Sequence, residues 1–275
     1  MINPKRHRAQ LDDLQRRIQE HPAHVEYWRC KGLKQTLAVF QVNAGELMAL
    51  LEQAATDAEL AMELVQNVRP PEVRDGFRLG VLRALHNYVA SAMTLVDHSR
   101  RMMRDRSGQI ADELEKRKEA FLANPEARFV QDLRNFTLHR ELPPLGHKVS
   151  MQNLNTPDVT MVSEVQLSVE SLRSWDGWTA TSLEFLNQQG GAVELRPVIE
   201  RHRDLVIDMN AWLLNELVDA NADLLDEVDE LIVERNAVLA GVSIEEGRRT
   251  TEEVTRQRTS PAADEGGPRE ASRPT

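Results

Sequence analysis

The chain has 275 residues, of which 41% are hydrophobic, 28% charged and 4% aromatic, and its formal net charge is −10. This is the composition of a soluble globular protein with one large domain or two small ones, and its acidity argues against attraction of nucleic acid by the whole surface. The longest apolar runs are well short of the roughly 20 residues that span a bilayer, so no membrane contact is expected.

The cysteine content and the first residues of the chain indicate which cellular compartment to expect. The single cysteine, Cys30, excludes an internal disulfide and a zinc site built from cysteines. The first residues, "MINPKRHRAQLDDLQRR", lack the apolar core of a secretory signal. A cytoplasmic location is therefore expected.

Four helices are predicted in the first half of the chain. Apolar residues repeat at spacings of three and four over about 34–67, and "RPPE" ends this helix because proline cannot continue the hydrogen-bond ladder. A second helix is expected over 77–105, a third over about 109–123 and a fourth over about 126–141. Because short connections favour antiparallel neighbours, residues 34–141 are predicted to form an antiparallel four-helix bundle.

The pattern changes period after the bundle. Apolar and polar residues alternate on both sides of the loop "NLNTPD", which predicts one β-hairpin over 145–169 with a single covered face. Helices are expected again at about 171–189 and 195–239, the second with a kink near "DANAD". From 244 to 275 too few apolar residues remain to offset the entropy of ordering, so this tail is predicted to be disordered. The chain is thus expected to form a mainly helical single domain over 1–243.

Charge is unevenly distributed along the chain. Residues 216–234 contain eight acidic residues and no Lys or Arg, which indicates a solvated helix face or a surface that docks a basic partner. Residues 69–140 contain 14 basic and 10 acidic residues. This mildly basic segment permits a phosphate-bearing ligand.

The candidate chemistry lies in the stretch "FVQDLRNFTLHRELPP", where Arg134, Asn135 and His139 crowd the end of the fourth helix. Asn135 and His139 are four residues apart and share a helix face. Arginine binds phosphate bidentately, histidine transfers protons near neutral pH and asparagine can orient the imidazole. This set requires no metal or cofactor. The alternative is structural, because His139 and Arg140 in a last helical turn also complement the helix dipole.

The segment "RNFTLH", at the end of a late helix in a helical bundle, resembles the HEPN family. The resemblance covers about 34–141, and it implies a metal-independent endoribonuclease of the toxin or defence type with Arg134, Asn135 and His139 as the site. It also implies RNA as the substrate, a homodimer in which two motifs face each other, and an antitoxin or another protein as partner. The bare Arg-to-His spacing recurs elsewhere, for example at Arg196 and His202, but without the following asparagine.

Cleavage of RNA by such a site would use the 2′-hydroxyl as nucleophile and leave 2′,3′-cyclic phosphate ends. The alternative function is that of a non-catalytic helical interaction or scaffold protein.

Three further features of the sequence are candidates for function. A polar stripe on the second helix could form the opposite wall of a cleft if it faced the fourth helix, or it is an ordinary solvated face; it comprises Asn87, Ser91, Thr94, His98 and Arg101. His21 and His24 have a ligand-like spacing, but no acidic or cysteine cluster completes a metal site, so none is expected. Trp175 and Trp178 are expected in a helix, in the core or packed on the hairpin.

Overall fold

The computed structural model describes residues 4–65, 72–104, 106–152, 160–246, 248 and 249, and most of these are helical, as predicted. Backbone contacts divide the chain into two compact units where the sequence predicts a single domain over 1–243. The larger unit is residues 29–220, and the smaller consists of residues 1–28 and 221–275. Among the described helices, none is both long enough and apolar enough to cross a membrane.

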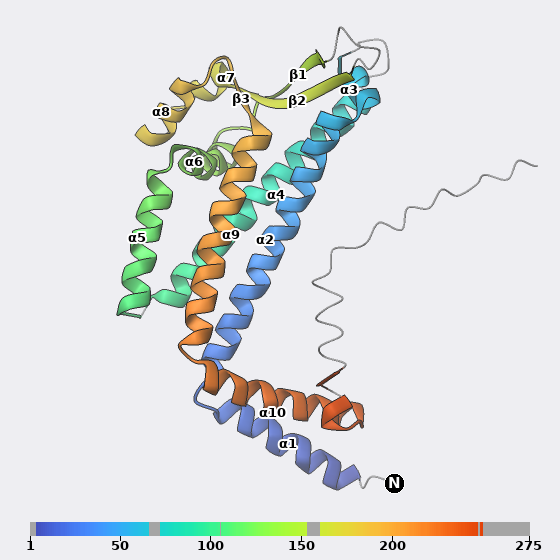
Figure 1. Cartoon of the computed structure of the whole chain (residues 1–275), viewed down its shortest axis with the longest axis vertical. Coiled ribbons are helices and arrows are strands. Elements are labelled where there is room, and N and C mark those ends of the chain that lie inside the picture. Colours follow the sequence, from blue (N-terminus) through green and yellow to red (C-terminus); the bar gives the residue numbers. More distant parts are fainter. Residues whose placement is uncertain (1–3, 66–71, 105, 153–159, 247, 250–275) are drawn as a thin grey trace, which may run out of the picture. The chain divides into compact units, whose positions relative to one another are not determined.

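Three long helices form the frame of the larger unit (Figure 1). They are α2 (His24–Thr56), whose first residues belong to the smaller unit, α4 (Glu72–Met103) and α9 (Leu195–Asp219). Two shorter helices, α5 (Gln109–Ala123) and α6 (Pro125–His139), pack against each other and against α9, and α6 also packs on α4.

A four-helix bundle closed within 34–141 is not confirmed. The C-terminal helix α9 completes the core, because its buried residues join the same apolar cluster as those of α2, α4, α5 and α6. The largest of the fully buried side chains are Tyr88, Phe40, Phe129 and Phe136. Helical periodicity shows which face of each helix is buried, but it does not show which distant segment covers that face.

The first predicted helix differs from the structure at both ends. It begins at His24 rather than near residue 34, and it is interrupted at Asp57, after which α3 (Ala58–Val65) begins. The Asp57 carboxylate accepts a hydrogen bond of 3.0 Å from the backbone N–H of Leu60. This is the capping contact that an aspartate makes at the start of a new helix.

The predicted hairpin strands are confirmed and belong to a small antiparallel sheet. β1 (Leu145–Gln152) pairs with β2 (Thr160–Ser168), with Leu145 opposite Leu167, and the predicted loop lies outside the described residues. A third strand, β3 (Ala192–Glu194), pairs with the other edge of β2, which gives the order β1-β2-β3. β3 has only three residues, too few for an alternating pattern to reveal it.

The single helix predicted for 171–189 is wrong. The chain forms α7 (Val169–Arg173) and α8 (Ala180–Gln188), and Trp175 and Trp178 lie in the connection between them. At Gly177 an added Cβ would collide with the Trp175 indole, so a larger residue here would displace that ring. Trp178 is buried and stacks on Phe129 and Phe136, which confirms the expected core position for this tryptophan.

The smaller unit pairs α1 (Pro4–Glu20) with α10 (Ala222–Ala240). An apolar cluster joins them, formed by Ile18, Ala23, Leu225, Val228 and Ile232. The expected break near 219–223 is confirmed, since α9 ends at Asp219 and α10 begins at Ala222. Of the predicted disordered tail, 244–275, residues 244–246, 248 and 249 are described and helical; the rest lies outside the described residues.

Candidate functional site

The helix that carries the predicted motif has well-defined ends. Asn124 caps the start of α6, because its side-chain oxygen accepts hydrogen bonds from the backbone N–H groups of Glu126 and Ala127 at 3.0 and 3.1 Å. Pro125 follows at the first helical position, where a missing N–H does no harm. The helix ends at His139, just before the two prolines at 143 and 144. The sequence therefore fixes where the motif lies on the helix.

The structure brings Arg134 and Asn135 together. Both are half-buried, and Nη1 of Arg134 donates a hydrogen bond of 3.1 Å to Oδ1 of Asn135. His139 is exposed. Five residues on an α-helix correspond to a rotation of about 140° away from the starting direction, so Arg134 and His139 point to different sides of α6. Within one copy of the chain, Arg134 is directed toward α4.

Arg134 lines a surface groove of about 210 Å³ between α4 and α6. Leu138 also comes from α6, and α4 contributes His86, Val89, Ala90, Met93, Thr94 and Asp97. His139 is not among the described residues that line this groove. Half of the lining residues are apolar, and the others supply a guanidinium, an imidazole, a hydroxyl and a carboxylate. The imidazole is that of His86.

Arg134 also lines a smaller cavity beside the groove. This cavity of about 20 Å³ has room for about one water molecule. Its polar lining is formed by Gln131 and Arg134 from α6 and by His202 and Asn210 from α9, and the rest is apolar. Arg134 thus lies between the surface groove and a polar spot in the core.

His202 is the titratable residue that the sequence reasoning missed. It is 2% exposed, and burial lowers the pKa of its imidazole to about 3, so the ring is neutral at pH 7. Its Nδ1 shares a hydrogen bond of 2.5 Å with the hydroxyl of Tyr88, and burial raises the pKa of that phenol. A neutral imidazole in this position is a fixed hydrogen-bonding group within the core.

The polar stripe proposed as a cleft wall has a different orientation. Nδ1 of His98 lies 2.7 Å from Oγ1 of Thr36, so His98 is turned to α2 rather than α6. Arg101 is exposed, and Asn87 is half-buried. Of the stripe, Thr94 lines the groove that holds Arg134. His86 and Asp97 also line the groove from α4. They directly precede the stripe residues Asn87 and His98 in the sequence.

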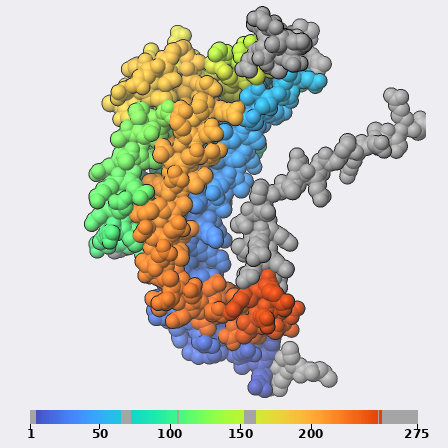
Figure 2. Space-filling model, viewed as in Figure 1, coloured from blue at the N-terminus to red at the C-terminus, as the bar shows by residue number. Residues whose placement is uncertain are grey.

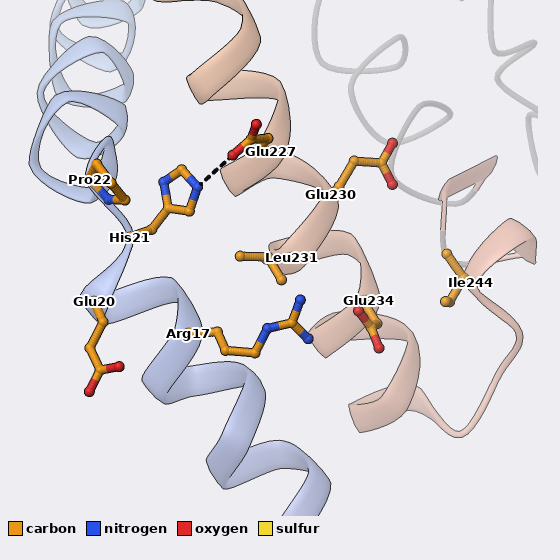
Figure 3. A pocket seen from close by; sticks show the side chains of 9 residues that line it. All are labelled: Arg17, Glu20, His21, Pro22, Glu227, Glu230, Leu231, Glu234 and Ile244. Atoms are coloured by element: carbon orange, nitrogen blue, oxygen red, sulfur yellow. Dashed lines mark hydrogen bonds and ion pairs between the residues drawn. The ribbon is translucent and has the colours of Figure 1, made fainter.

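The smaller unit has a separate pocket of about 620 Å³ between α1 and α10 (Figure 3). Nε2 of His21 lies 3.0 Å from a carboxylate oxygen of Glu227, and Arg248 pairs with Glu230 at 2.6 Å. The acidic side chains of α10 at this pocket are exposed or half-buried, and docking of a basic partner here stays a prediction. In the part of the chain that the structure describes, no three His, Cys, Asp or Glu side chains are grouped to hold a metal ion.

Comparisons with known proteins return no match. No family model fits the chain, and neither a curated protein nor a solved structure is similar to it. The resemblance of "RNFTLH" to the HEPN family is therefore untested.

Proposed function

We propose that this protein is a helical interaction protein, which binds a macromolecular partner through the outward side of α2. The observation that carries this proposal is a gap in the charge pattern. Between Lys34 and Glu46 the helix has no charged residue, although 28% of the whole chain is charged. Solvated helix faces usually carry charged side chains, so an uncharged stretch with exposed valines indicates a surface that a partner covers.

The outward side of this segment is uncharged and largely apolar, although Gln35 and Gln41 are also exposed on it. The inward side is formed by Leu37, Phe40, Ala44 and Leu47, all buried. On the other side, Val39 and Val42 are 56% and 63% exposed, and Ala38, Gly45 and Ala49 are also exposed. Contiguous apolar surface of this kind marks interaction sites.

To test this proposal, the protein is produced in cells of its source organism with a photo-reactive amino acid in place of Val42. We expect covalent adducts on irradiation, because a side chain covered by a partner lies within reach of it. The matched control carries the same amino acid in place of Glu119, an exposed residue of α5. Adducts that are no more abundant at position 42 than at position 119 would contradict the proposal.

The second candidate function is metal-independent RNA cleavage, as the resemblance implies. Two observations favour it. Arg134 is held by Asn135 and faces a groove, and His139 is exposed and so accessible to a polymer. Because Arg134 and His139 point to different sides of α6, this mechanism needs two copies of the motif or a second histidine. His86 is the histidine that shares the groove with Arg134.

In this mechanism the RNA 2′-hydroxyl loses its proton to a general base and attacks the adjacent phosphorus, while the bond from phosphorus to the 5′-oxygen breaks and that oxygen takes a proton from a general acid. His139 is the base or the acid, and Arg134 holds the added negative charge. We expect 2′,3′-cyclic phosphate ends in the presence of EDTA and no cleavage of DNA. His139→Ala should lower the cleavage rate by at least about 100-fold, since a positioned acid–base group contributes about 10²–10⁴-fold. Arg134→Ala should lower it by about 100-fold or more, since it removes the positive charge that stabilises the transition state. The measurement is cleavage of a labelled RNA by purified protein.

Two further variants identify the site. The His98→Ala variant is the control. Because the His98 side chain is turned to α2, this variant should cleave RNA at the wild-type rate. If His86→Ala abolishes cleavage and His139→Ala does not, the groove of a single copy is the site. Wild-type protein that leaves RNA intact would remove this second candidate.

A further inference from the structure

We infer that the partner of α2 is a second copy of this chain, bound antiparallel through the same helix face. This inference rests on the proposed interaction function and names its partner. The face in question, called here the α2 outer face, is formed by Gln35, Ala38, Val39, Val42, Gly45 and Ala49. These residues follow one another at helical spacings of one, three and four, so they lie on one side of the helix.

The larger unit leaves the α2 outer face uncovered. On one flank of α2, Thr36 contacts His98 of α4. On the other flank, Glu52 forms an ion pair with Arg196 of α9, and Figure 2 shows the surface of α2 beside that of α9. The core lies on the third side, where Phe40 and Leu47 are fully buried. The outer face points away from all three.

The charge pattern along α2 selects an antiparallel second copy. The segment before the uncharged stretch is basic, with exposed Arg29, Lys31 and Lys34, and Glu46 and Glu52 follow it. A two-fold axis level with residue 40 places Lys34 of each copy opposite Glu46 of the other. The same axis brings Ala38 opposite Val42. A parallel arrangement would instead place like charges together, which is unfavourable.

The size and shape of the face suit a helix pair. The α2 outer face, from residue 35 to residue 49, extends over about 21 Å at about 1.5 Å per residue. Small side chains allow two helices to approach closely, and an added Cβ at Gly45 would meet no atom within 4 Å. Glu46 has a distant pairing with Arg83 at 4.0 Å and is about half exposed, so it remains accessible to a second copy. The groove at Arg134 lies elsewhere, between α4 and α6.

Sedimentation equilibrium or light scattering of the full chain tests the dimer. We expect a mass of about 62 kDa, twice the 31.2 kDa of one chain. Val42→Glu should weaken dimerisation by at least about 100-fold, because it places two carboxylates in an apolar seam near the axis. Val73→Glu, the same substitution at an exposed valine of α4, should leave the dimer intact. A monomer at all concentrations, or a dimer insensitive to Val42→Glu, overturns the inference.

Charge reversal tests the antiparallel arrangement. Lys34→Glu and Glu46→Lys each create two like-charge contacts in the dimer, and each should weaken it by about tenfold, or about 1.4 kcal/mol. The double variant restores opposite charges across the seam and should return to within about threefold of wild type. A double variant as weak as the two single effects combined overturns the antiparallel dimer.

The adducts from position 42 separate this inference from the proposed function. An adduct of twice the chain mass supports both. An adduct with a different protein leaves the interaction function standing and overturns the dimer. An adduct within one chain, or the absence of any adduct, overturns both.

Discussion

Asp132→Ala is expected to lower the free energy of unfolding by about 3–5 kcal/mol, because it removes the buried acceptor of hydrogen bonds from the buried Ser182 and the half-buried Thr179 and leaves the half-buried Arg128 without its carboxylate. Asp132 is 2% exposed. Its Oδ2 accepts hydrogen bonds from the backbone N–H of Thr179 at 3.1 Å, from the Thr179 hydroxyl at 2.6 Å and from the Ser182 hydroxyl at 2.7 Å. Its other oxygen lies 3.4 Å from a guanidinium nitrogen of Arg128.

Urea unfolding of three variants separates this carboxylate from a general effect of mutation. Asp132→Asn keeps the size and one acceptor oxygen, so we expect a smaller loss of about 1–2 kcal/mol. Asp97→Ala removes an exposed acidic residue and should change stability by about 0.5 kcal/mol or less. If Asp132→Ala loses less than about 1 kcal/mol, Thr179 and Ser182 find other partners and Asp132 does not hold α8 on α6.

Asp132 also shows why part of the fold could not be predicted from the sequence. Through Thr179 it fixes the start of α8 on α6, and Phe129 and Trp178 stack beside this contact. The residues involved are 47 positions apart, and no local pattern links them. By contrast, α5 has the predicted bounds, because apolar periodicity and the "NP" break after it are local signals. The strands of the predicted hairpin were found for the same reason.

The sequence predicts only those features of the candidate site that depend on the local geometry of one helix. Arg134, Asn135 and the end of α6 follow from the sequence, since capping residues and prolines fix the helix. The direction of the α4 stripe did not follow, because a helical pattern gives the relative phase of His98 and His86 but not the neighbour each one faces. His98 contacts α2, and His86 lines the groove with Arg134.

The sequence pattern of α9 contains a signal for the burial of His202. The buried positions of α9 repeat at spacings of three and four, and two of them are polar, His202 and Asn210. A polar residue within an apolar stripe predicts a buried hydrogen bond, because burial without one is unfavourable. Both residues do make such bonds: His202 with Tyr88, and Asn210 with Ser99 at 2.9 Å.

The buried imidazole of His202 is expected to make the protein sensitive to acid. Its pKa is about 3 in the folded chain, against about 6.5 when exposed. Between about pH 3 and pH 6.5 the unfolded chain binds one more proton than the folded chain, so the free energy of unfolding falls as the pH falls. The slope is about 1.4 kcal/mol per pH unit, and the full difference of 3.5 units corresponds to about 5 kcal/mol. Burial and the nearby Arg78 also lower the pKa of His147, which adds a change of the same sign.

Comparison of pH profiles isolates the contribution of His202. Free energies of unfolding measured from pH 7 to pH 4.5 should fall less steeply in His202→Gln than in wild type, by about 1.4 kcal/mol per unit below pH 6.5. His86→Gln, at an exposed position on α4, should keep the wild-type slope. Equal slopes for wild type and His202→Gln would mean that the folded chain accepts the proton at His202. Domains are stable by only about 5–15 kcal/mol, so the loss of free energy from His202 alone is large enough to bring wild type close to unfolding near pH 3. Relative to its own stability at pH 7, His202→Gln should therefore lose less stability in acid.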